Sequence, residues 1–132
     1  MNESLPQFAV YTIRRSQELD DIFVKGGTGQ FTERKKWVAA LGLFEQAKQN
    51  GLKLPIIFAD AGDTRDGLLY YGFIRDLSAD ESTTTCSFEG LSRITAATPK
   101  HSLRLQSTGK PLSDDYIRPY AIVHTPDYVR AA

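Results

Sequence analysis

The sequence predicts a single α+β domain in which a barrel-like sheet of about six strands is flanked by two main helices. Three observations predict it. Residues 54–94 contain consecutive strand patterns separated by polar turns, two segments (16–25 and 33–50) repeat apolar residues at helical spacing, and 132 residues suit one core but not two. We therefore expect one domain over residues 1–132, with residues 1–6 as a flexible tail.

The N-terminal part begins with a strand pattern and continues into a helix pattern. Residues 8–13 are apolar and β-branched, which predicts an opening strand. Residues 16–25 predict a short helix with Ser16 as its N-cap, ended by glycine. Glycines at positions 26, 27 and 29 match a phosphate-binding loop only in part, because the lysine and serine of that motif are absent. A flexible linker is the favoured interpretation of residues 26–29.

Residues 33–50 predict the longest helix, with Thr32 as N-cap and Gly51 just beyond its end. Its apolar residues share one face, which we expect to pack on the sheet: Trp37, Ala40, Leu41, Phe44 and Ala47. The cations at 34–36 would then occupy the first turn, where the helix dipole disfavours them. They are either a solvated face or are kept for a ligand.

The centre of the chain predicts a meander. Residues 54–59 form a short apolar run, and residues 68–77 are apolar on both alternating faces, as in a wall covered on both sides. Gly72 predicts a bulge or the close approach of a backbone or ligand. The threonine-rich residues 83–88 suit a half-exposed strand, and apolar residues spaced by three over 88–94 indicate a helical turn or an irregular crossing.

The C-terminal part predicts two more strands. Residues 101–106 alternate strictly between polar and apolar, and residues 120–123 are apolar. A loop over 107–111 and a helical turn over 113–117 separate them.

Composition excludes several classes of function. Sixteen basic and sixteen acidic residues produce no global field that would draw a polyanion or an anionic membrane. The single cysteine, Cys86, cannot form an internal disulfide and is read as a small core residue. His101 and His124 lack metal-binding spacing, so no metal and no cofactor are expected. The absence of a signal-peptide pattern or an apolar span predicts a cytoplasmic protein without membrane contact.

An opening strand, a short helix, a glycine-containing turn and a meander with the sequence Tyr-Gly-Phe-Ile at 71–74 resemble the PUA-like superfamily, which includes ASCH and EVE domains. The ASCH signature places a lysine three residues before a glutamate and a basic residue two after it. Glu33 matches the acidic position and Lys35 the basic one, but Gln30 stands where the lysine is expected. The motif is therefore matched in part.

The resemblance implies a small mixed or antiparallel PUA-like β-barrel, with a pocket between barrel and helices that accepts RNA or a modified base or nucleotide. Such a pocket needs aromatic faces for stacking and polar groups that read a base edge. The candidates are Trp37, Tyr70 and Tyr71 for stacking, Arg14, Arg34, Lys35 and Lys36 for phosphates, and Gln30, Glu33 and Asp60 for base edges. Trp37 on an apolar helix face also suits the core, and only one of the two tyrosines can face a given side.

Two other classes stay open. Some ASCH domains resemble small amidohydrolases of modified nucleosides that depend on a Lys, a Thr and a Glu. This chain offers Thr32 and Glu33, but Gln30 removes the expected base, so catalysis is less favoured and no catalytic residue is assigned. The other class is an assembly module that uses strand edges, and the oligomeric state is left open.

Overall fold

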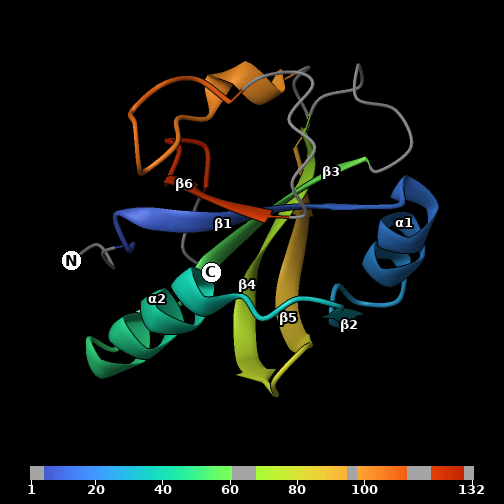
Figure 1. Ribbon diagram of the computed structural model, residues 1–132. Coiled ribbons are helices and arrows are strands. Elements are labelled where there is room, and N and C mark those ends of the chain that lie inside the picture. Colours follow the sequence, from blue (N-terminus) through green and yellow to red (C-terminus); the bar gives the residue numbers. More distant parts are fainter. Residues whose placement is uncertain (1–4, 61–67, 95–97, 113–119, 130–132) are drawn as a thin grey trace.

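The structure, a computed structural model, describes residues 5–60, 68–94, 98–112 and 120–129, and in this part it is an α+β domain with a six-stranded mixed sheet and two α-helices (Figure 1). The strands are β1 (Phe8–Arg14), β2 (Gly29–Glu33), β3 (Pro55–Asp60), β4 (Leu68–Ala79), β5 (Thr84–Arg93) and β6 (Tyr120–His124). The helices are α1 (Ser16–Val24), α2 (Val38–Gln49) and a single 3-10 turn, η2 (Lys100–Ser102).

The strand order is β2-β5-β4-β3-β1-β6. Strands β1 and β3 run parallel, with Val10 opposite Ile56, and the other neighbours are antiparallel. The predicted meander is confirmed, since β3, β4 and β5 are consecutive neighbours. Strands β2 and β6 occupy the two outer positions and do not pair with each other in the described residues. The sheet is therefore open there, and the expected closed barrel is not confirmed.

The two faces of the sheet carry two apolar clusters. The first contains buried residues of α1 and α2 together with Val10, Phe58 and Phe88 of the strands. The second lies on the opposite face and includes Leu103 and Val129 from the C-terminal part. Strand β4 contributes side chains to both clusters, which confirms the prediction that both of its faces are covered.

Gly72 lies at an irregularity of the β4–β5 pairing, where the register shifts between Tyr71 and Phe73. A Cβ atom at this position would lie 3.0 Å from the carbonyl oxygen of Glu89. The predicted bulge and close backbone approach are confirmed.

Both helices are present, but their starts differ from the predictions. Helix α1 is preceded by Arg15 with no side-chain cap, so Ser16 is not the N-cap. Helix α2 begins at Val38 rather than at residue 33, because residues 29–33 form β2 instead. Within β2, Phe31 is the residue buried in the core. The predicted helix had been extended from the apolar pattern at Trp37 back to residue 33, where the structure has the end of this strand.

Two further segments differ from the predictions. Strand β5 continues to Arg93, so the helical turn over residues 88–94 is wrong, whereas the alternative of an irregular course agrees with the register shift in this strand. Gly90, with φ +65°, and the neighbouring register shift insert one residue, which lets Phe88 and Leu91 face the same core at a spacing of three.

Residues 101–106 form part of a 3-10 turn and single bridges rather than a strand, although Leu103 is buried and Arg104 exposed as the alternation predicted. The bridge from Leu105 to Val123 lies along the outer side of β6. The helical turn expected over 113–117 lies outside the described residues.

The glycines at 26–29 form a packed turn rather than a flexible linker. The amide of Gly27 donates to the carbonyl of Ile22 at 2.9 Å, and the carbonyl of Gly27 accepts from the amide of Leu91 at 3.2 Å. A Cβ atom at Gly29 would lie 2.8 Å from the ring of Phe88. Glycine is needed here for packing.

The last two residues of the predicted N-terminal tail are anchored. Leu5 packs against the second apolar cluster, and the carbonyl of Pro6 accepts a hydrogen bond from Thr125 Oγ1 at 2.7 Å. Among the described residues, no helix has the length and apolar character required to cross a bilayer.

Candidate nucleic-acid interface

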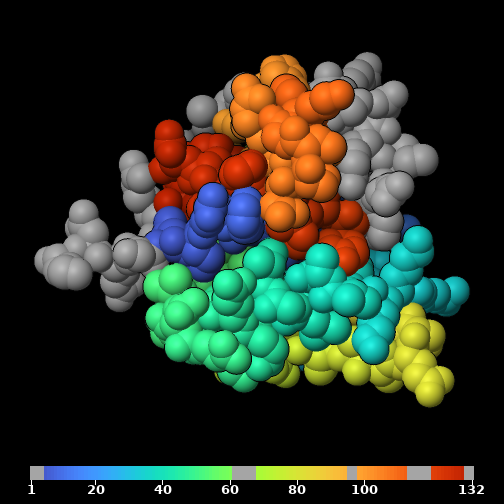
Figure 2. Space-filling model, turned by 60° about the vertical axis from the view of Figure 1, so that its left-hand side comes forward, coloured from blue at the N-terminus to red at the C-terminus, as the bar shows by residue number. Residues whose placement is uncertain are grey.

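Arg34, Lys35 and Lys36 form an exposed segment between β2 and α2, which we call the cationic turn. The part of the chain that the structure describes contains no ion pair to any of the three. The cyan segment leading into α2 protrudes from the outline of the molecule in Figure 2. Because α2 starts at Val38, these cations precede its first turn instead of lying within it. Three neighbouring charges therefore face solvent, and no carboxylate of the described residues pairs with them.

The backbone of the cationic turn is fixed by Thr84, a residue of β5 that is only 1% exposed. Its hydroxyl donates to the carbonyl of Lys35 at 2.7 Å and accepts from the amide of Trp37 at 2.9 Å. One hydrogen bond is made by the residue before Lys36 and the other by the residue after it. The side chains of the turn are thus free while its main chain is held.

A strip of uncharged polar side chains continues from the cationic turn across β2 and β5; we call it the polar strip. It consists of Gln30, Thr32, Thr85 and Ser87. Thr32 and Thr85 join through their hydroxyls at 3.3 Å, and Ser87 Oγ donates to Gln30 Oε1 at 3.0 Å. Gln30, predicted to read a base edge, does lie on the same strand that leads into the predicted phosphate-binding cations.

Trp37 does not form a stacking platform, because its side chain is fully buried. Its ring stacks on Tyr120 at 4.5 Å and packs at 5.7 Å from Phe31. The indole nitrogen is buried without a hydrogen-bond partner in the described residues. Trp37 is a core residue, the alternative that its position on an apolar face had left open.

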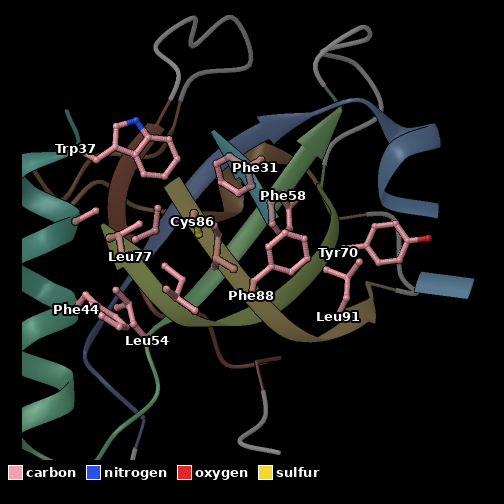
Figure 3. Packing of buried hydrophobic residues seen from close by; sticks show 14 of the residues in the cluster. Phe31, Trp37, Phe44, Leu54, Phe58, Tyr70, Leu77, Cys86, Phe88 and Leu91 are labelled. Carbon is pink, nitrogen blue, oxygen red and sulfur yellow. The ribbon is translucent and has the colours of Figure 1, made fainter. Parts of the chain in front are cut away.

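Figure 3 shows Trp37 and Tyr70 at opposite sides of the first apolar cluster, with the rings of Phe31, Phe58 and Phe88 between them. These rings contact one another at centroid separations of 5.1 to 6.2 Å. The space between sheet and helices is filled at this place. The expected pocket lined by Trp37 and Tyr70 is therefore not formed.

Tyr70 fastens α1 to the sheet. Its hydroxyl donates to Asp20 at 2.5 Å and accepts from Arg93 at 3.2 Å, while the Arg93 guanidinium lies 5.1 Å from the centroid of Phe23. The pKa of Tyr70 is raised mainly by burial of the phenol and, to a smaller extent, by its hydrogen bond to Asp20. Tyr71 faces the other side of the sheet and belongs to the second cluster, so neither tyrosine is placed to stack a base.

Arg14 and Glu33, both predicted to belong to the binding site, lie side by side. The charge of Arg14 is, however, already neutralised by carboxylates. Arg14 donates to Glu33 and to Glu18 at 3.1 Å each, and its guanidinium lies 4.8 Å from the centroid of Phe31. Asp60 is opposite Arg14 in the β1–β3 register. With two carboxylates as partners, Arg14 is unsuited to hold a phosphate.

Sequence reasoning missed Thr84, the residue that organises the cationic turn. Strand alternation through the buried Cys86 and Phe88 was a usable signal, because it places Thr84 on the same inward face. The contact to Lys35, which lies 49 positions away, left no trace in the sequence.

The described residues show no metal-binding group of His, Cys, Asp and Glu side chains. Burial, with a smaller contribution from Asp76, raises the pKa of the Cys86 thiol to about 12, so it is protonated at neutral pH. No protein-family model matches the chain, and no curated protein matches it either. Only the fold and the surface of the molecule therefore bear on its function.

Proposed function

We propose that the protein is a nucleic-acid recognition module that binds single-stranded RNA, or a strand with a modified nucleotide, across the cationic turn and the polar strip. The observation that carries the proposal is the cationic turn itself. Its three adjacent exposed cations have no carboxylate partner in the described part of the chain, and Thr84 holds their main chain. Lysine and arginine contacts to phosphates supply most sequence-independent affinity.

The polar strip supports the same proposal. Hydroxyl and amide groups offer donors and acceptors to riboses and base edges without adding negative charge next to the phosphates. The PUA-like interpretation of the fold belongs to this proposal, with the mixed sheet as an open form of that barrel and with the ligand on its surface. Because the net charge of the chain is balanced, a nucleic acid would be attracted locally by the cationic turn and not by the protein as a whole.

An assembly role is the second candidate, because β2 is an outer strand of the sheet. In the described part of the chain, its outer edge has no strand partner, and an unpaired edge can accept a strand from another chain. The outer side of β6 is in contrast already bridged by Leu105. Light scattering tests this candidate, since a strict monomer at high concentration would exclude self-pairing through β2.

The RNA proposal is tested by fluorescence anisotropy with a labelled single-stranded RNA at low salt, and with a methylated DNA duplex as a second probe. The test variant is Arg34→Gln, Lys35→Gln, Lys36→Gln. The matched control, Lys25→Gln, Lys48→Gln, Lys110→Gln, removes the same charge from three exposed lysines elsewhere. We expect the test variant to lose at least about tenfold in affinity for RNA and the control to change far less. Equal losses, or no binding by the unmodified chain, would refute the proposal.

A further inference from the structure

A cavity of about 200 Å³ lies at the other end of α2, between that helix and the N-terminal segment Leu5–Phe8. Its apolar lining includes Phe8, Leu43 and Leu54, and its polar lining residues are Gln7, Gln46 and Asn50, each of which carries a side-chain amide. Leu54 is buried, whereas the three amides are exposed. The cavity thus combines apolar residues, one of them buried, with three exposed residues that carry amides.

The main chain holds both walls of this cavity. On one side, the amide of Thr125 donates to the carbonyl of Gln7 at 2.9 Å. On the other, the amide of Leu52 donates to the carbonyl of Ala47 at 2.8 Å, just after the last turn of α2, and Gly51 adopts the left-handed φ of +69° that this turn requires. The cavity is therefore formed before any ligand arrives.

The lining selects the chemistry of the occupant. Among the described residues, none of those that line the cavity is charged, so an ionic ligand would lose its hydration without compensation from them. An apolar cavity of about 150 Å³ holds one benzene molecule, so this volume suits a flat molecule of one or two rings. Asparagine and glutamine offer a donor and an acceptor side by side, the arrangement that reads the edge of a base. A neutral heteroaromatic ring of nucleobase size satisfies all three requirements.

We infer that this cavity receives one unpaired nucleobase of the strand whose phosphates lie on the cationic turn. The inference rests on the function proposed above and extends it by naming the base-binding site. The twelve residues of α2 separate the two places by about 18 Å, a span that a strand of a few nucleotides covers. In Figure 2 the N-terminal strand adjoins one end of α2, and the cyan segment leads into its other end, on a single face of the molecule.

The test is an NMR titration of the isotope-labelled chain with adenosine, guanosine, cytidine, uridine and N6-methyladenosine, and with toluene as an apolar ring lacking a polar edge. We expect at least one nucleoside to shift the side-chain amide signals of Gln7, Gln46 and Asn50. The variant Gln46→Ala, Asn50→Ala should weaken nucleoside and RNA binding by about tenfold. The control Gln17→Ala, Gln106→Ala removes two exposed amides elsewhere and should leave binding unchanged.

The outcomes separate the cavity from the proposed function. The base-binding site would be overturned if no nucleoside shifted the amide signals, or if toluene bound with an affinity equal to that of the nucleosides. Either result would do so even where RNA binding still depends on the cationic turn. RNA affinity that is unaffected by Gln46→Ala, Asn50→Ala would also overturn it. Nucleoside binding without any RNA binding would instead reject the proposed function and leave a site for a free heterocycle.

Discussion

The hydroxyl of Thr84 donates to the carbonyl oxygen of Lys35 at 2.7 Å, from a side chain that is 1% exposed. The hydroxyl oxygen of Thr84 in turn accepts a hydrogen bond from the amide of Trp37 at 2.9 Å. A single buried side chain therefore joins the start of β5 to a loop that carries three exposed charges. Holding this loop in the free protein reduces the conformational entropy lost when a ligand binds.

Replacing Thr84 by valine keeps the shape of the side chain but removes both hydrogen bonds. The amide of Trp37 and the carbonyl of Lys35 would lose this partner in a buried place, which costs about 1–3 kcal/mol of unfolding free energy. Urea unfolding measures the loss. Thr85→Val is the matched control, because Thr85 is half-exposed and makes only a 3.3 Å contact with Thr32. Equal stability of the two variants would contradict the role given to Thr84.

Trp37 is the only tryptophan, so its fluorescence reports directly on the packing of the core. Because the ring is fully buried against Tyr120, we expect blue-shifted emission that acrylamide quenches weakly in the native state and strongly in urea. Single-stranded RNA should leave this emission unchanged. Quenching by RNA would show that a base reaches Trp37 and would restore the stacking interpretation.

The fold followed from the sequence where burial alone set the pattern. The short apolar run of β3 and the two apolar faces of β4 predicted both strands, and Gly72 predicted the irregularity in β4, because a glycine inside a strand often marks a bulge. The start of α2 could not be predicted in this way. Phe31 and Trp37 both point into the core, Phe31 from β2 and Trp37 from the position just before α2, and the helical spacing from Trp37 onward does not mark where the helix begins.

Arg14 should contribute to stability rather than to binding. Arg14→Met leaves Glu18 and Glu33 without their shared cation, and we expect a loss of about 1–2 kcal/mol for these partly exposed pairs. Glu18→Gln should cost less, since Arg14 keeps Glu33. Arg15→Met, at an exposed neighbour, serves as control in urea unfolding. RNA affinity should be the same in all three, and a selective loss in Arg14→Met would contradict the neutralised state of Arg14.

Stability should decline in alkali because two buried groups resist ionisation in the folded state. Burial raises the pKa of Cys86 from 9.0 to about 12 and that of Tyr128 from 10.0 to about 12. The stability contributed by Cys86 is complete below pH 9 and is lost as pH rises toward 12, by at most about 1.4 kcal/mol per pH unit.

Urea unfolding at closely spaced pH values separates the two groups. Cys86→Ala should flatten the decline between pH 9 and 10, where Tyr128→Phe should leave it unchanged. A decline between pH 9 and 10 that Cys86→Ala leaves as steep as before would contradict the assignment to the thiol.

The candidate site was predictable in its charges but not in its geometry. The cations of residues 34–36 were identifiable from the sequence, whereas the neutralisation of Arg14 depends on the two carboxylates that the fold brings to it. Tyr70 and Trp37 were reasonable as stacking residues by type. Aromatic type alone does not distinguish an exposed platform from a core ring.

The salt dependence of RNA binding tests the central claim most directly. If the three cations of the cationic turn contact phosphates, a plot of log affinity against log salt for single-stranded RNA should have a slope of about −2. Arg34→Gln, Lys35→Gln, Lys36→Gln should bring that slope close to zero, while Lys25→Gln, Lys48→Gln, Lys110→Gln should retain it. The same slope in the unmodified chain and in the cationic-turn variant would contradict phosphate binding at this site.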